Sequence, residues 1–128
     1  MKYSKSCRFC NLGTNEKIIF KTKYFFLVKN LYSRIGDHFL LISKSHIRDE
    51  TEMNISEWQN YKTAITEADH IICKRINIAP IIFINPKSFQ SIKHFHRHFV
   101  SAKFGKLGVE TALTEYLYRN TKNMPIKA

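Results

Sequence analysis

The chain has 128 residues, of which 44% are hydrophobic, and this predicts one domain over residues 1–128 with a substantial core. The longest apolar runs, such as YFFLV and IIFI, have the length of strands, so we expect no membrane span. The polar and basic first residues predict an unexported, cytoplasmic protein. The formal net charge of +11 predicts attraction to phosphate esters or RNA, although scattered Lys and Arg residues equally fit a solvated basic surface.

The first half of the chain predicts three strands followed by a helix. Residues 17–20 and 24–30 are rich in aromatic and branched residues and predict a strand pair, and residues 38–43 predict the next strand. Over residues 56–76, apolar residues recur at steps of three and four, which predicts a long amphipathic helix. Ser56 and Gln59 fit a capping box at its start. The expected apolar stripe consists of Trp58, Tyr61, Ile65, Ala68, Ile72 and Ile76.

The second half predicts two more strands and a last helix. Residues 81–84 and 92–100 read as strands joined by a loop too short for a helical crossover, so this pair should be antiparallel. An amphipathic pattern over 109–118 predicts a C-terminal helix. The expected class is therefore α+β, with an antiparallel sheet of about five strands and one long helix packed on it.

Three histidines alternate along KHFHRHFV, residues 93–100. Alternate side chains of a strand share a face, so His94, His96 and His98 should point the same way, roughly 6.5 to 7 Å apart. A neutral imidazole is a competent nucleophile toward phosphorus. Taken alone, the run fits an exposed polar strand equally well. Hydrogen-bonding groups that lead into it are Asn85, Ser88, Gln90 and Ser91.

The three cysteines do not suit a secreted disulfide scaffold, because their number is odd and two of them form Cys7-x-x-Cys10. Reduced thiols in the cytosol or a metal fit better. The pair alone is half of a zinc site and could equally be a redox pair. Cys73 lies on the predicted helix and is expected to be a packing residue.

These motifs together resemble the histidine triad (HIT) superfamily of nucleotide hydrolases and transferases. The run from His94 to Val100 resembles its signature, residues 25–47 are similar to its N-terminal segment, and NPKSFQSIKHFHRHF has its asparagine, glutamine, serine and triad in order. The resemblance covers residues 7–100 and implies a HIT-like fold in which 101–128 is an extension. It also implies a homodimer.

The resemblance implies a role for each matching residue. His96 would attack the α-phosphorus of a nucleotide and form a nucleotidyl-histidine intermediate. His98 would contact the phosphate and assist at the leaving group, and Gln90 and Ser91 would bind phosphate or leaving-group oxygens. The nucleotide-binding positions implied are Asn85 for phosphate, Asn30 for ribose, and Phe20, Val28 and Leu31 for the base.

A zinc site is also implied, formed by Cys7 and Cys10 with His46 and His94. Because protein would fill all four positions, the ion would be structural. His38 is expected to form only local hydrogen bonds, and Arg97 departs from the apolar residue usual in the family. The sequence therefore favours a nucleotide hydrolase acting on a dinucleoside polyphosphate or phosphoramidate. The alternatives are a nucleotidyltransferase or nucleic-acid adenylate remover, and a non-catalytic, zinc-stabilised RNA-binding module.

Overall fold

The computed structural model describes residues 1–33, 36–101, 114 and 118. Within them the chain forms a five-stranded sheet of order β1-β2-β3-β5-β4, in which all neighbours are antiparallel. The expected α+β class is confirmed. The elements are β1 (Glu16–Lys21), β2 (Phe25–Asn30), β3 (His38–Ser43), η1 (Glu50–Glu52), α1 (Ile55–Ile76), β4 (Ile81–Phe83), η2 (Lys87–Phe89) and β5 (His96–Val100).

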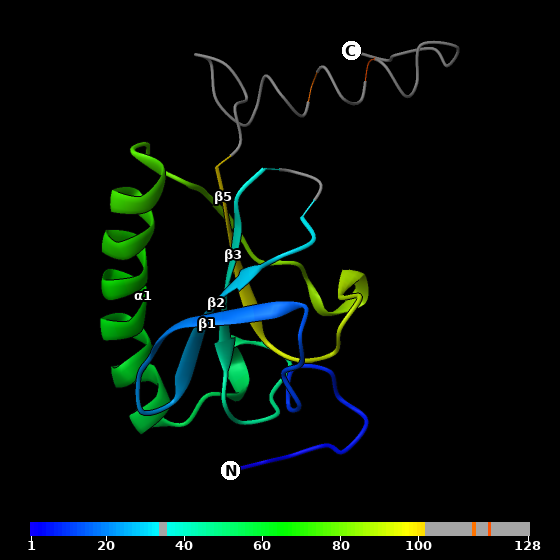
Figure 1. Ribbon diagram of the computed structural model, residues 1–128. Coiled ribbons are helices and arrows are strands. Elements are labelled where there is room, and N and C mark those ends of the chain that lie inside the picture. Colours follow the sequence, from blue (N-terminus) through cyan, green and yellow to red (C-terminus); the bar gives the residue numbers. More distant parts are fainter. Residues whose placement is uncertain (34–35, 102–113, 115–117, 119–128) are drawn as a thin grey trace.

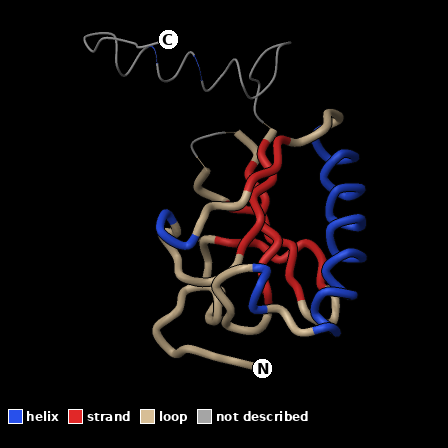
Figure 2. The backbone as a smooth tube through the Cα atoms, turned by 180° about the vertical axis from the view of Figure 1, so that it is seen from behind, coloured by secondary structure: helices blue, strands red, loops and turns tan. Residues whose placement is uncertain are grey.

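One face of the sheet is covered by α1, as the views from two sides show (Figure 1, Figure 2). Alternate strand residues such as Leu27, Leu41 and Phe99 are fully buried against this helix. Burying one such side chain contributes roughly 1.5 to 3 kcal/mol. The helix contributes the buried residues Tyr61, Ala64, Ala68 and Ile72 to the same core cluster.

The opposite face of the sheet is covered by the N-terminal segment, which is blue in Figure 1. Val28 and Leu40 point to this face, next to Leu27 and Leu41 on the other, as strand alternation requires. They pack with Phe9, which the N-terminal segment supplies. The central strand β3 is therefore buried along its whole length.

The N-cap of α1 lies two residues before the expected cap, Ser56. Its N-cap is Asn54, whose side chain accepts from the Glu57 amide while the Glu57 carboxylate accepts from the Asn54 amide, so the capping box expected at Ser56 is wrong. The expected inward position of Trp58 is also wrong, because 46% of its surface is exposed. Asn77, with φ of 59°, ends the helix in the left-handed conformation. No helix among the described residues is long and apolar enough to cross a membrane.

The last two strands pair antiparallel, as expected, with Ile81 opposite Val100. The strand expected over 92–100 is shorter than predicted, because residues 92–95 leave the ladder and the Phe95 amide donates to the Ile47 carbonyl at 2.6 Å. The helix expected over 109–118 lies outside the described residues apart from Thr114 and Tyr118.

Substituting the two candidate caps separates them experimentally. We expect Asn54→Ala to lower the free energy of unfolding by about 1 kcal/mol, because the Glu57 amide loses its acceptor. The matched variant Ser56→Ala should change it by no more than about 0.5 kcal/mol, as an exposed residue of the first turn. Urea denaturation of the three proteins measures this. Equal losses in both variants would contradict the assigned cap.

Candidate active site and metal centre

Four side chains converge beside the start of β5. The ligand atoms of Cys7, Cys10, His46 and His94 all lie within 4.8 Å of one another. The shortest separations are 3.2 Å between the Nδ1 atoms of His46 and His94, and 3.3 Å from Cys7 Sγ to His94 Nδ1 and from Cys10 Sγ to His46 Nδ1. The residues that the sequence assigned to one metal site are therefore brought together.

These separations suit a tetrahedral ion. Zinc holds sulfur at about 2.3 Å and imidazole nitrogen at about 2.0 to 2.1 Å, so neighbouring ligands of a tetrahedron lie roughly 3.3 to 3.8 Å apart. Hydrogen bonding alone does not explain the cluster, because one nitrogen, His94 Nδ1, faces Cys7 Sγ, Cys10 Sγ at 3.5 Å and His46 Nδ1. Two thiols and two imidazoles form a donor set that zinc prefers.

Hydrogen bonds outside the cluster orient its ligands. The side-chain amide of Asn11 donates to the backbone carbonyls of Ser4, Lys5 and Cys7 and so stabilises the fold of the Cys-x-x-Cys loop. The Nε2 atom of His94 lies 2.6 Å from the Ser43 carbonyl and must carry its proton there, so Nδ1 presents a lone pair to the thiols. Burial lowers the pKa of His94 to about 4, which keeps this ring neutral.

Phe9 connects the metal-type cluster to the rest of the histidine strand. It lies between the two cysteines in the sequence and is buried. Its ring centroid is 6.0 Å from that of His94 and 5.0 Å from that of His96, in edge-to-face arrangements. No sequence pattern predicts this contact, since an aromatic residue inside a Cys-x-x-Cys loop can point either way. The loop therefore covers His96 as well as completing the metal ligands.

The proton position on His96 is set by its backbone neighbour. His96 Nδ1 lies 2.7 Å from the carbonyl oxygen of His94, and a carbonyl can only accept, so Nδ1 carries the hydrogen. Burial lowers the pKa of His96, which favours the neutral ring. Its Nε2 atom consequently bears a lone pair. A neutral imidazole of this tautomer is a nucleophile at Nε2.

His98 has the complementary tautomer, and a chain of hydrogen bonds from the end of β2 determines it. The Tyr32 amide donates to Asn30 Oδ1 at 3.1 Å, which turns Asn30 Nδ2 toward His38 Nδ1 at 3.2 Å. His38 Nδ1 must accept, so the His38 proton is on Nε2, which lies 2.8 Å from His98 Nδ1. Neutral His98 therefore carries its proton on Nε2.

The Nε2–H group of His98 is buried and has no partner among the described residues. Burial, with the nearby rings of His96 and His38, lowers the pKa of His98 to about 3. Phe83 of β4 stacks on the His98 ring at 4.3 Å and holds its orientation. The ring centroids of His96 and His98 are 4.8 Å apart, so a lone pair and an unused donor are presented side by side.

The other predicted catalytic residues lie in the connection between β4 and β5. Gln90 donates to the Arg48 carbonyl at 2.6 Å, and Arg48 donates back to Gln90 Oε1 at 3.4 Å. In this state the Gln90 amide is engaged by Arg48. Ser91 is exposed and lines a pocket beside the Cys-x-x-Cys loop. Asn85 is half-buried and precedes η2. Their catalytic and phosphate-binding roles stay predictions.

A second pocket, of about 440 Å³, lies at the end of β2, lined by Arg8, Asn15, Asn30 and Tyr32. Asn30, the expected ribose contact, is one of its lining residues, and its role stays a prediction. The three expected base contacts do not form one cluster. Val28 is buried on the same face as Phe9, Leu31 is exposed, and Phe20 packs with the core on the α1 side.

Arg97 alternates with the histidines and faces the helix. Its guanidinium donates to the hydroxyl of buried Tyr61 at 3.3 Å and lies over the Phe99 ring at 5.7 Å. The charge that departs from the apolar pattern thus lies on the face opposite His96 and His98, where Nε of Arg97 is buried without a partner among the described residues.

The division of roles among the three alternating histidines defines a histidine triad protein of the type with an N-terminal Cys-x-x-Cys: His94, just before β5, joins the metal-type cluster, and two histidines of β5 present an acceptor and a donor. Comparison with known families agrees. The family described as "Scavenger mRNA decapping enzyme C-term binding" matches residues 5–114, and the chain belongs to that family. No curated protein sequence matches the chain.

Solved structures share the fold at low identity. A HIT family hydrolase from Clostridium thermocellum is 21% identical with a TM-score of 0.66, over 83% of this chain and 99% of that one. A histidine triad protein from Clostridium difficile is 18% identical with a TM-score of 0.64, over 83% and 96%. A Plasmodium falciparum diadenosine triphosphate hydrolase in complex with Cyclomarin A is 17% identical with a TM-score of 0.62, over 88% of each chain.

The lowered pKa of His98 makes stability depend on pH. An unfolded histidine titrates near 6.5 and folded His98 at about 3, so between these values the unfolded chain binds more protons and unfolding becomes easier as pH falls. This contribution is complete above about pH 6.5 and is lost toward pH 3. We expect His98→Asn to lose less stability than the unmutated protein between pH 7 and pH 5, measured by urea denaturation.

The matched control is His70→Asn, because His70 is exposed on α1. It should keep the pH slope of the unmutated protein. Comparing slopes under one buffer series cancels any acid effect on the metal ligands, which all three proteins share. An unchanged slope in His98→Asn would show that folded His98 is not held neutral by burial.

Proposed function

We propose that the protein is a nucleotide hydrolase that cleaves at the α-phosphorus of a dinucleoside polyphosphate or nucleoside phosphoramidate. The observation that carries the proposal is the complementary tautomer pair: His96 presents a lone pair at Nε2 and His98 presents an unused Nε2–H. Family membership supports an enzyme of the histidine triad superfamily. Diadenosine triphosphate is named as the substrate of one structural neighbour and supports the same class.

The reaction would proceed in two balanced steps. His96 Nε2 attacks the α-phosphorus, the bond to the leaving group breaks, and the leaving group takes the bonding electron pair. The Nε2–H of His98 donates a hydrogen bond to the oxygen that gains charge. Water then attacks phosphorus; one of its protons stays on the new phosphate oxygen, the other passes to the released leaving group or to solvent, and His96 departs as a neutral imidazole. The products are a nucleoside monophosphate and the free leaving group.

Neighbouring residues would hold the nucleotide. Asn30 lines the pocket at the end of β2 and would contact the ribose, while Asn85, Ser91 and Gln90 would bind phosphate oxygens. Gln90 can bind a phosphate oxygen only if the hydrogen bond from its side chain to the Arg48 carbonyl is broken. A homodimer belongs to the same proposal, and the exposed apolar residues Ile82 and Phe83 of the edge strand β4 support it.

The first experiment measures hydrolysis of diadenosine polyphosphates and adenosine phosphoramidate. The unmutated protein should release AMP, and His96→Ala should lose at least about 1,000-fold in kcat because no nucleophile replaces Nε2. His70→Ala is the control, since that histidine is exposed on α1. Transfer of the nucleotide to an acceptor, without hydrolysis, would favour the nucleotidyltransferase. RNA binding that falls steeply with salt and is unchanged in His96→Ala, without turnover, would favour the binding module.

We further propose that the ion in the Cys7, Cys10, His46 and His94 cluster is zinc. Four protein ligands close its coordination, so the ion would supply no reactive position and would stabilise the N-terminal loop. Its support is the donor set and the separations of 3.2 to 3.5 Å.

Removing the metal should therefore affect stability before activity. We expect chelation, or Cys10→Ser, to lower the melting temperature by several degrees, because Phe9 and the loop lose their anchor. Loss of hydrolysis should follow only at temperatures where the loop detaches. Metal analysis of the purified protein identifies the ion, and calorimetry measures the shift. Chelated protein that keeps its melting temperature but loses activity at low temperature would contradict a structural role.

A further inference from the structure

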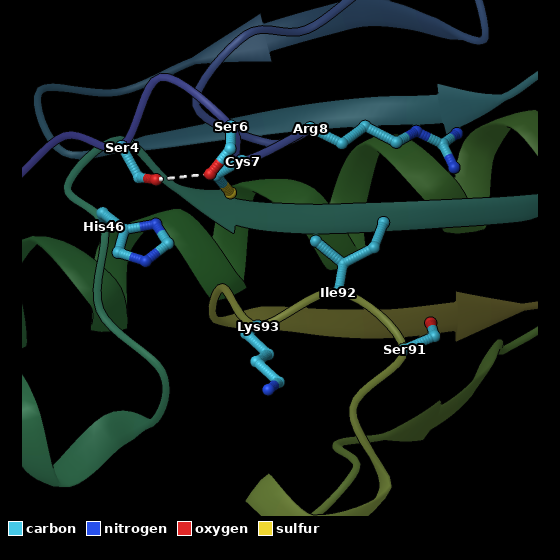
Figure 3. A pocket seen from close by; sticks show the side chains of 8 residues that line it. All are labelled: Ser4, Ser6, Cys7, Arg8, His46, Ser91, Ile92 and Lys93. Carbon is cyan, nitrogen blue, oxygen red and sulfur yellow. Dashed lines mark hydrogen bonds between the residues drawn. The ribbon is translucent and has the colours of Figure 1, made fainter.

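A polar pocket of about 400 Å³ lies between the Cys-x-x-Cys loop and the segment that leads into β5 (Figure 3). The N-terminal segment and residues 91–93 form opposite walls. We call it the Arg8–Lys93 pocket. Its lining residues are Ser4, Ser6, Cys7, Arg8, His46, Ser91, Ile92 and Lys93.

The lining of this pocket suits an anion. It includes two cations, Arg8 and Lys93, and three serine hydroxyls, and none of its residues is acidic. Phosphate oxygens accept hydrogen bonds from hydroxyl, guanidinium and ammonium groups. Two thiolates at the metal cluster would not cancel these cations, because a divalent ion balances them. Because Arg8 is paired with buried Glu16, the charge that the pocket offers to an anion is mainly that of Lys93.

The pocket lies beside the candidate active site, and Ser91, whose expected role is to bind leaving-group oxygens, is one of its lining residues. The side-chain amide of Asn11 donates to the carbonyls of Ser4, Lys5 and Cys7, so each of these acceptors already has a donor. Ile92 packs against the cluster that contains Phe9, whose ring contacts His96. Arg8 lines both this pocket and the pocket at Asn30.

We propose that the Arg8–Lys93 pocket binds phosphate groups of the departing half of the substrate, and so selects leaving groups that carry phosphate over amines. This inference rests on the proposed hydrolase function and extends it to the leaving group. The nucleoside that becomes the covalent intermediate occupies the pocket at Asn30, and the second phosphate-bearing group lies across Arg8 from it.

The hydrogen bonds that run from Asn30 through His38 to His98 independently support the preference for leaving groups that carry phosphate. A departing phosphate needs only a hydrogen bond, because it is stable as an anion near neutral pH, whereas a departing amine must receive a proton. His98 is a neutral Nε2–H donor whose Nδ1 already accepts from His38. Giving up that proton would leave an imidazolate, which is costly in a buried site. The site can therefore donate a hydrogen bond more readily than a proton.

Lys93 is the suitable residue to substitute. Its side chain is exposed, and it forms no salt bridge within the described part of the chain, so its loss should not disturb the fold. Arg8 is unsuitable because it forms an ion pair with buried Glu16. The control is Lys62→Ala, which removes the same charge from an exposed position on α1.

The test compares kcat/KM for diadenosine tetraphosphate and for adenosine phosphoramidate. In Lys93→Ala the ratio of the two values should fall about 10-fold, because one charged contact to the leaving group is lost. In Lys62→Ala the ratio should remain that of the unmutated protein. A ratio unchanged by Lys93→Ala would overturn the proposal while leaving the hydrolase intact.

Binding of inorganic tripolyphosphate to the His96→Ala protein provides a readout that needs no turnover. Calorimetric titration should give a dissociation constant that rises about 10-fold when Lys93→Ala is added, and not when Lys62→Ala is added. Equal binding in both double variants would overturn the pocket. Lys93-dependent binding without hydrolysis of any substrate would support the pocket and instead defeat the proposed hydrolase.

Discussion

His94 is the residue on which both the metal-type cluster and the tautomer of His96 depend. Its ring faces the two thiols through Nδ1, while its carbonyl oxygen, 2.7 Å from His96 Nδ1, fixes where the neighbouring imidazole holds its proton. A displacement of this one backbone position would therefore change two sites at once. The loop that supplies the thiols also supplies Phe9, so the segment that completes the metal-type cluster also covers His96.

Burial explains why a chain with a net charge of +11 can keep His38, His96 and His98 neutral. Removing a charged ring from water is costly, and the pKa values of His38, His96 and His98 are all lowered with burial as the main cause. Three neutral rings can then be ordered by hydrogen bonds alone. For His38 and His98 the series of hydrogen bonds begins at the backbone amide of Tyr32, a donor that does not titrate.

Sequence patterns predicted the features that depend on periodicity. They did not predict those for which two local patterns fit equally well and tertiary contacts determine the outcome. Alternation placed the histidines opposite Arg97, and the short connection made the last strand pair antiparallel. Asn54 and Ser56 each begin a valid capping pattern, and burial of Glu57 decides between them. The contact of His38 with His98 depends on the register that pairs Leu40 with His98, which no local pattern reveals.

The direction of the hydrogen-bond chain has a chemical consequence beyond orientation. Asn30 donates to His38 Nδ1, and His38 in turn donates from Nε2 to His98 Nδ1. The Nε2–H group of His98 is left without a partner among the described residues. A chain that began with an acceptor would reverse every tautomer and present a lone pair at the same place. His98 would then act as a base. The Asn30 amide, rather than the histidine signature, therefore distinguishes a hydrogen-bond donor from a proton acceptor at this position.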